Sequence, residues 1–155
     1  MAKKILERFD RRAIEIIRKI SPVVARISLF TVFFWFGILK IFNISPANPL
    51  VENLLEKTLP FIAFEQFIVF FSVFEMAIGV AFLIPKMERL AIALLIPHMF
   101  ATAMPLILLP EITWQGFMTP TLEGQYIIKN LLIVALALGL ASRLQPFNFG
   151  EKKNG

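Results

Sequence analysis

The chain has 155 residues, of which 57% are apolar and 17 are phenylalanine, and its mean hydropathy is +0.74. A soluble domain of this length could not bury so much apolar surface, so composition excludes a water-soluble globular protein and favours an integral membrane protein. The chain has no cysteine and one histidine, which excludes disulfides, thiolate chemistry, iron–sulfur clusters, a histidine-rich metal site and a bis-histidine haem. A redox role would therefore need a borrowed or diffusible cofactor.

Positive charge gathers at the amino terminus. The formal net charge is +5, and eight of the sixteen Lys and Arg residues fall within the first 26 positions. A basic segment joined to a membrane domain usually meets anionic lipid or fixes the topology of the chain. We therefore expect a lipid bilayer, and no nucleic acid, as the partner of this segment.

Residues 1–20 are predicted to form a cytoplasmic amphipathic helix ahead of the membrane domain. Apolar residues recur at helical spacing, and charged residues fill the opposite face. The apolar residues are Ile5, Leu6, Phe9, Ala13, Ile16, Ile17 and Ile20. We expect the helix to lie in the membrane interface with this face in lipid. The alternative is a solvated helix that packs on a partner subunit.

The membrane domain is predicted to occupy residues 21–143, with spans at about 22–43, 61–84, 90–109 and 125–142. Ser21 and Pro22 resemble the N-cap and first-turn proline of a new helix. Pro97 and Pro105 are expected to kink the third span. The loop at 44–60 can hold a short surface helix, and the loop at 110–124 carries Trp114 as an interfacial anchor.

The distribution of Lys and Arg predicts the orientation of the spans. Thirteen of the sixteen lie in the amino-terminal segment, in the turn at 86–89 or after the last span. Both termini, including a tail at 144–155, are therefore expected to be cytoplasmic in a bacterial inner membrane. Short connections between the spans predict an all-α, up-down four-helix bundle.

Four polar side chains interrupt the external halves of the spans, and we expect them to share a pocket. They are Lys40, Glu65, Lys129 and Asn130. Two lysines against one glutamate leave a positive site, which suits a small anion or the carbonyl oxygens of a quinone. Two alternatives remain open: Lys40 can extend to the external headgroups, and Lys129 with Asn130 can serve only to join helices.

Glu75 and His98 are expected near the middle of the membrane. A carboxylate and an imidazole at one depth can pass protons, so both are candidate catalytic residues in a proton relay. They can equally form a satisfied core pair, or Glu75 can bond a backbone carbonyl freed by Pro97. Depth alone does not show whether the two residues share a face.

Three segments in order resemble the DoxX family of small four-helix membrane proteins. They are RISLFTVFFWFGILKIF, FEMAIGVAFLIP and GQYIIKNLLIVALALGLAS, which together bring Lys40, Glu75, Gly79, Lys129 and Asn130 into the comparison. Members with a proposed role are similar to membrane subunits of thiosulfate:quinone oxidoreductase or of an oxidative-stress complex. Some relatives carry cysteine pairs for thiol redox chemistry, which this chain cannot perform.

These observations predict a membrane subunit of a quinone-linked oxidoreductase, with no intrinsic cofactor and no metal site. One alternative is a non-catalytic accessory subunit that joins other membrane or cytoplasmic subunits through its amino-terminal helix. Another is a small solute or proton carrier, which the prolines of the third span and the polar groups at two depths would favour. Its weakness is that the chain has no inverted repeat.

Overall fold

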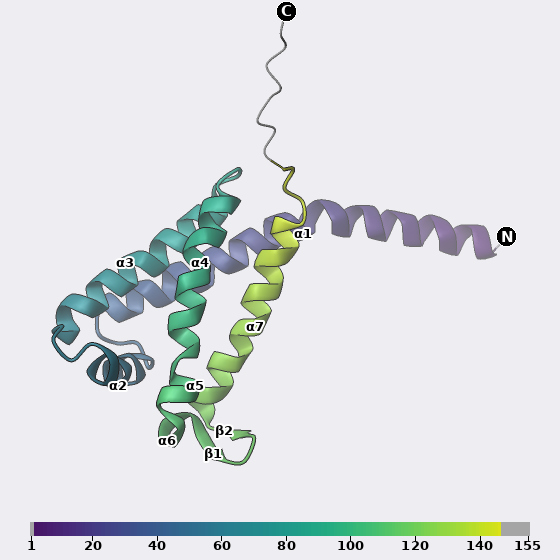
Figure 1. Ribbon diagram of the computed structural model, residues 1–155. Helices are drawn as coiled ribbons and strands as arrows, with labels where there is room; N and C mark the ends of the chain where they lie inside the picture. Colours follow the sequence, from purple (N-terminus) through teal and green to yellow (C-terminus); the bar gives the residue numbers. More distant parts are fainter. Residues whose placement is uncertain (1, 147–155) are drawn as a thin grey trace, which may run out of the picture.

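A computed structural model describes residues 2–146, and helices dominate it (Figure 1). The helices are α1 (Ala2–Ile41), α2 (Asn48–Thr58), α3 (Phe64–Leu83), α4 (Glu88–Ala103), α5 (Pro105–Leu108), α6 (Pro110–Thr113) and α7 (Leu122–Ala141). A short hairpin joins β1 (Trp114–Gly116) to β2 (Thr119–Pro120). The predicted tail at 144–155 lies outside the described residues from 147 onward.

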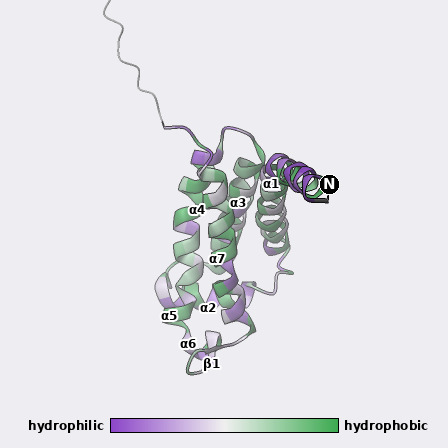
Figure 2. Cartoon of the chain, turned by 90° about the vertical axis from the view of Figure 1, so that its right-hand side faces the viewer, coloured by the Kyte–Doolittle hydropathy of each residue, from purple (hydrophilic) through white to green (hydrophobic). Residues whose placement is uncertain are grey.

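Four helical segments are long and apolar enough to cross a membrane. They are Lys3–Ile41, Phe64–Leu83, Glu88–Leu108 and Leu122–Ala141. Hydrophobic residues cover most of α3, α4 and α7, whereas hydrophilic residues gather on the amino-terminal part of α1 and near the turns (Figure 2). The fold is therefore compatible with an all-α membrane bundle, as the sequence predicted.

The helix boundary predicted at Ser21 and Pro22 is wrong, because α1 runs without interruption through Pro22. Proline removes the N–H that would bond the carbonyl of Arg18, four residues earlier. Arg143, beyond α7, supplies a donor instead: its Nη1 donates to that carbonyl at 3.4 Å, and its Nη2 donates to Ser21 Oγ at 3.1 Å. The guanidinium therefore supports the helix at the point where proline weakens it.

The part of α1 before Pro22 projects away from the other helices (Figure 1). We call residues 3–20 the arm. Its apolar face has no partner within the described chain, and its large apolar side chains are at least half exposed at Ile5, Leu6, Phe9, Ile16, Ile17 and Ile20. We call these six exposed side chains the apolar stripe.

The rest of α1 packs along α3, and two glycines let the backbones approach closely. A Cβ on Gly79 would lie 3.2 Å from the Phe30 carbonyl oxygen and from the Phe33 Cβ. A Cβ on Gly37 would lie 3.0 Å from the Ser72 carbonyl oxygen. Small residues commonly permit such contacts between membrane helices. We call this contact the α1–α3 seam.

The apolar core extends from the seam to α4 and α7. Its buried members are Ala25, Leu29, Phe33, Ile78, Ala81, Phe82, Ala91, Leu95, Ala137 and Leu140. Pro97 lies within α4, whereas the chain begins a new short helix at Pro105. The kink expected at Pro105 coincides with this break, and the kink expected at Pro97 stays a prediction.

Polar contacts tie the helices together at both ends of the core. At one end, Arg26 pairs with Glu88, and Arg89 donates to the carbonyl oxygen of Gln145. At the other end, Lys57 of α2 donates to the carbonyl oxygen of Leu108. We call these the arginine end and the α2 end.

Candidate functional site

Three helices bring one polar side chain each to the interior. Lys40 comes from the last turn of α1, Glu75 from the middle of α3 and His98 from α4. The Lys40 Nζ donates to Glu75 Oε2 at 2.6 Å, and the His98 Nε2 lies 3.5 Å from Glu75 Oε1. One carboxylate therefore bridges an ammonium and an imidazole. We call these residues the triad.

The triad is almost completely enclosed. The side chains of Lys40 and Glu75 are 7% exposed, and that of His98 is 3% exposed. An isolated charge at such a position is costly, whereas a hydrogen-bonded pair offsets much of the loss of hydration. The burial of Lys40 and Glu75 is therefore tolerable because each faces the other.

Aromatic rings surround His98 and restrict its position. Its ring stacks on Phe71 at a centroid separation of 5.2 Å and meets the edge of Phe33 at 5.4 Å. Phe74 lies 6.2 Å away, and the Lys40 Nζ lies 5.8 Å from the centre of the Phe71 ring. Within the described chain, the His98 Nδ1 is buried without a hydrogen-bond partner. This nitrogen is therefore free to bond a ligand or a water molecule.

The sequence predicted a different grouping for the four polar residues of the external halves. Only Lys40 joins the interior site, and its partner is Glu75, not Glu65. Glu65 is exposed in the first turn of α3, and Asn130 is half-buried. Lys129 is exposed, and its Nζ lies 5.4 Å from the centre of the Tyr126 ring. The predicted pocket of Lys40, Glu65, Lys129 and Asn130 is not formed among the described residues.

The reason for this difference is geometric. Lys40 and Glu65 were matched by depth, but a lysine has a long, flexible side chain that can extend inward as well as outward. Lys40 extends to the carboxylate of Glu75, which faces α1 across the seam. The sequence placed Glu75 and His98 at one depth, and the structure shows that they also face each other.

Sequence reasoning missed the ion pair between Arg26 and Glu88 at the arginine end. The Glu88 side chain is 7% exposed, and the pair joins α1 to the start of α4. Glu88 lies in the segment 86–89 that the sequence predicts as a turn, where a carboxylate usually faces water. A useful signal would have been Arg26 itself, since it lies inside the first apolar span on the expected cytoplasmic side.

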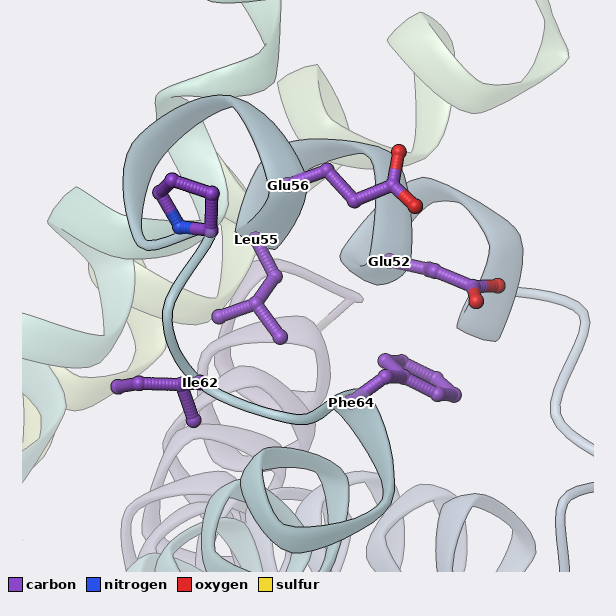
Figure 3. A pocket seen from close by; sticks show the side chains of 6 residues that line it. Glu52, Leu55, Glu56, Ile62 and Phe64 are labelled. Carbon is purple, nitrogen blue, oxygen red and sulfur yellow. The ribbon is translucent and has the colours of Figure 1, made fainter.

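Two hollows flank the core. An apolar groove of about 360 Å³ runs between α4 and α7 and is lined by nine apolar residues, among them Leu95, Met99 and Leu138. A smaller hollow of about 180 Å³ lies at the α2 end, where Leu55, Ile62 and Phe64 form an apolar surface beside Glu52 and Glu56 (Figure 3). Of these two hollows, only the groove is lined entirely by residues of the candidate membrane-spanning helices.

The groups of the triad are of kinds that can exchange protons. A bridging carboxylate can share a proton with an imidazole, and the adjacent ammonium stabilises the ionised carboxylate. Across residues 2–146, no three His, Asp or Glu side chains gather in a way that could hold a metal ion. Comparisons with models of protein families, with curated proteins and with solved structures found no match to this chain.

Proposed function

We propose that this chain is a DoxX-like membrane subunit of a quinone-linked oxidoreductase, in which Lys40, Glu75 and His98 exchange protons with a quinone. The observation that carries the proposal is the carboxylate of Glu75, which contacts an ammonium on one side and an imidazole on the other. Buried ionisable groups in membrane proteins commonly mark proton or substrate pathways. The reduction of a quinone consumes protons, so it needs such groups.

The proposed placement is an up-down bundle in a bacterial inner membrane, with both termini cytoplasmic. Its support is the clustering of basic residues at the arginine end, where Arg26, Arg89 and Arg143 all make contacts. Cytoplasmic loops carry an excess of Lys and Arg. The arm would then lie along the cytoplasmic interface with its apolar stripe in lipid.

The groove between α4 and α7 favours a quinone over a small anion. It is wholly apolar and borders the same helix that carries His98. A quinone has a long isoprenoid chain, which needs apolar surface of this kind, whereas an inorganic anion does not. The isoprenoid chain would lie in the groove. The ring would pass beyond the groove lining into the core to meet the His98 Nδ1, which is buried without a hydrogen-bond partner in the described chain.

The test is a comparison of two lysine substitutions. Full-length protein in lipid nanodiscs is equilibrated with decylubiquinone, and the retained quinone is quantified by mass spectrometry. Lys40→Met disrupts the triad, whereas Lys129→Met removes the same charge from the exposed side of α7. Without the Lys40 ammonium, the Glu75 carboxylate that faces His98 loses its hydrogen-bonded counter-charge, so we expect Lys40→Met to weaken binding roughly tenfold.

Lys129→Met should bind decylubiquinone as the unmodified protein does. Equal retention by both variants and the unmodified protein would contradict a quinone site at the triad. Glu75→Gln is a second probe, because it keeps the size of the side chain and removes its charge. It should weaken retention as Lys40→Met does.

The exposed arm favours a second candidate function, an accessory subunit that packs on a larger membrane complex. An apolar stripe of this length can contact a partner helix as well as lipid. Deletion of residues 2–20 distinguishes the two functions. An accessory subunit would lose its partners in pull-down experiments, whereas a self-contained quinone site would retain decylubiquinone.

A further inference from the structure

The turn that follows α1 connects Lys40 to the surface. Asn43 is exposed and has a φ of 55°, a left-handed conformation that asparagine tolerates better than most residues. Its N–H donates to the carbonyl oxygen of Lys40 at 3.0 Å. Its Oδ1 accepts a hydrogen bond of 2.6 Å from the Asn48 Nδ2. Hydrogen bonds thus run from the last turn of α1 to the first residue of α2.

This turn buries polar atoms that helix packing does not require. Ser45 is 6% exposed and Asn48 is 5% exposed. The Asn48 Oδ1 is buried without a hydrogen-bond partner within the described chain. Buried acceptors of this kind are usually satisfied by water, and the carbonyl groups at the end of a helix add further acceptors nearby. The turn is therefore suited to hold water close to the backbone of Lys40.

A buried serine lies close to the triad on its α2 side. Ser72 lies one turn before Glu75 on α3, is fully buried and donates to the carbonyl oxygen of Ile68 at 2.6 Å. Its backbone lies beside Gly37, which is one turn before Lys40 on α1. Ser72 therefore adds a buried polar group on the α2 side of Glu75.

The opposite side of the triad is apolar. Between the triad and the ion pair of Arg26 with Glu88, the three helices contribute Leu29, Phe33, Ile78, Ala81, Phe82, Ala91 and Leu95, each at most 4% exposed. Water is not retained in tightly packed apolar surroundings, because it needs two to four polar partners. We therefore expect this side of the core to exclude water.

The acidic face of α2 lies next to the polar turn. Asn48, Glu52 and Glu56 are spaced four residues apart and therefore share one face of the helix. Both carboxylates are exposed and line the hollow at the α2 end (Figure 3). Negative surface charge raises the local concentration of protons.

We propose that the Asn43–Asn48 turn is the mouth of a one-sided water path, through which the triad exchanges protons with the solution at the α2 end. A proton passes from water in the turn to the carboxylate of Glu75 and on to the His98 imidazole. In the proposed orientation, these protons come from the external side of the membrane. The inference rests on the proposed proton exchange at the triad, but its test uses no quinone.

The test measures the reach of water with single cysteines, since the chain has none of its own. Ser72→Cys and Ala81→Cys form a matched pair on α3, because both positions are at most 3% exposed and they lie on opposite sides of Glu75. Each full-length variant in nanodiscs is treated with the small cation 2-aminoethyl methanethiosulfonate, and modification is followed by intact-protein mass spectrometry.

We expect Cys at position 72 to react roughly tenfold faster than Cys at position 81, since only the former lies on the water path. Adding Asn48→Leu to the Ser72→Cys protein should slow its reaction by roughly the same factor, whereas adding Asn48→Ser should leave the rate unchanged. Circular dichroism checks that all variants retain their helices.

Equal reaction rates at positions 72 and 81 would overturn the proposed path, and so would an unchanged rate at position 72 after Asn48→Leu. These outcomes are independent of quinone binding. A protein that binds no decylubiquinone and still reacts selectively at position 72 would contradict the proposed function but leave the water path in place.

Discussion

The α1–α3 seam buries a lysine, whereas the exposed side of α7 leaves a lysine accessible. At the seam, the Lys40 side chain is 7% exposed and its ammonium is bonded to Glu75. On α7, Lys129 also interrupts an apolar helix, yet it is exposed, and its ammonium lies beside the ring of Tyr126. The two lysines differ in which face of their helix they occupy.

This difference shows what each region requires of its polar residues. In the seam, the helix backbones are so close that a charged side chain cannot reach the surface. A buried charge there needs an opposite charge beside it. Lys129 lies two turns from the start of α7, where a long side chain can extend along the helix to the headgroups. A lysine within a span therefore indicates a buried site only when its face is buried as well.

The largest expected effect comes from removing one partner of the buried pair. Glu75→Ala leaves the Lys40 ammonium without its counter-charge in a nearly closed interior. Breaking a buried pair in this way costs about 3–5 kcal/mol. We therefore expect a loss of this size in the free energy of unfolding, measured by titrating the micelle-embedded protein with sodium dodecyl sulfate and following helix content.

Two control variants sharpen this result. Lys129→Met should change the free energy of unfolding by less than about 0.5 kcal/mol, as for most exposed substitutions. The double variant Lys40→Met with Glu75→Met should regain most of the stability, because apolar replacement of a whole buried pair is often neutral. A similar loss in Glu75→Ala and in Lys129→Met would show that the two regions do not differ.

The sequence could predict the four candidate membrane-spanning segments because hydrophobic length alone identifies them. The sequence could also predict the depth of polar residues, since Glu75 and His98 were expected at one level and meet in the structure. The sequence could not predict which face of its helix each residue occupies, because these helices are apolar almost all round and give little directional signal. Glu65 and Lys129 were therefore assigned to a pocket that they do not form.

The continuity of α1 depends on a contact that is remote in sequence. Ser21 followed by Pro22 is a typical helix start, and local rules predict a boundary there. The donor that compensates for the proline comes from Arg143, more than 120 residues later. Local sequence patterns contain no information about such a contact.

A second comparison of the two regions uses their glycines. Gly79→Ala would place a Cβ 3.2 Å from the Phe30 carbonyl oxygen, so the helices of the seam must move apart. Overpacking of this kind typically costs about 1–3 kcal/mol. We expect a loss of this size in the sodium dodecyl sulfate titration, together with weaker retention of decylubiquinone, because Lys40 and Glu75 lie across the same seam.

Gly139→Ala is the matched control on α7, where an added Cβ would meet nothing within 4 Å. Alanine is the better helix former by roughly 0.5–1 kcal/mol, so this variant should be as stable as the original protein or slightly more stable. If Gly139→Ala were the more damaging of the two, close packing would belong to α7 and not to the seam.

The smallest expected effect is at the contact of Arg143, beyond α7, with Arg18 and Ser21 of α1. Arg143→Met removes the donor to the Arg18 carbonyl and should cost about 0.5–1.5 kcal/mol, the usual contribution of a hydrogen bond. Pro22→Ala restores the N–H that this carbonyl lacks, so Arg143→Met should cost less in the Pro22→Ala background. A double-mutant cycle in the same titration measures the difference. Equal costs in both backgrounds would mean that Arg143 acts only through Ser21, and the explanation for the continuous helix would have to be abandoned.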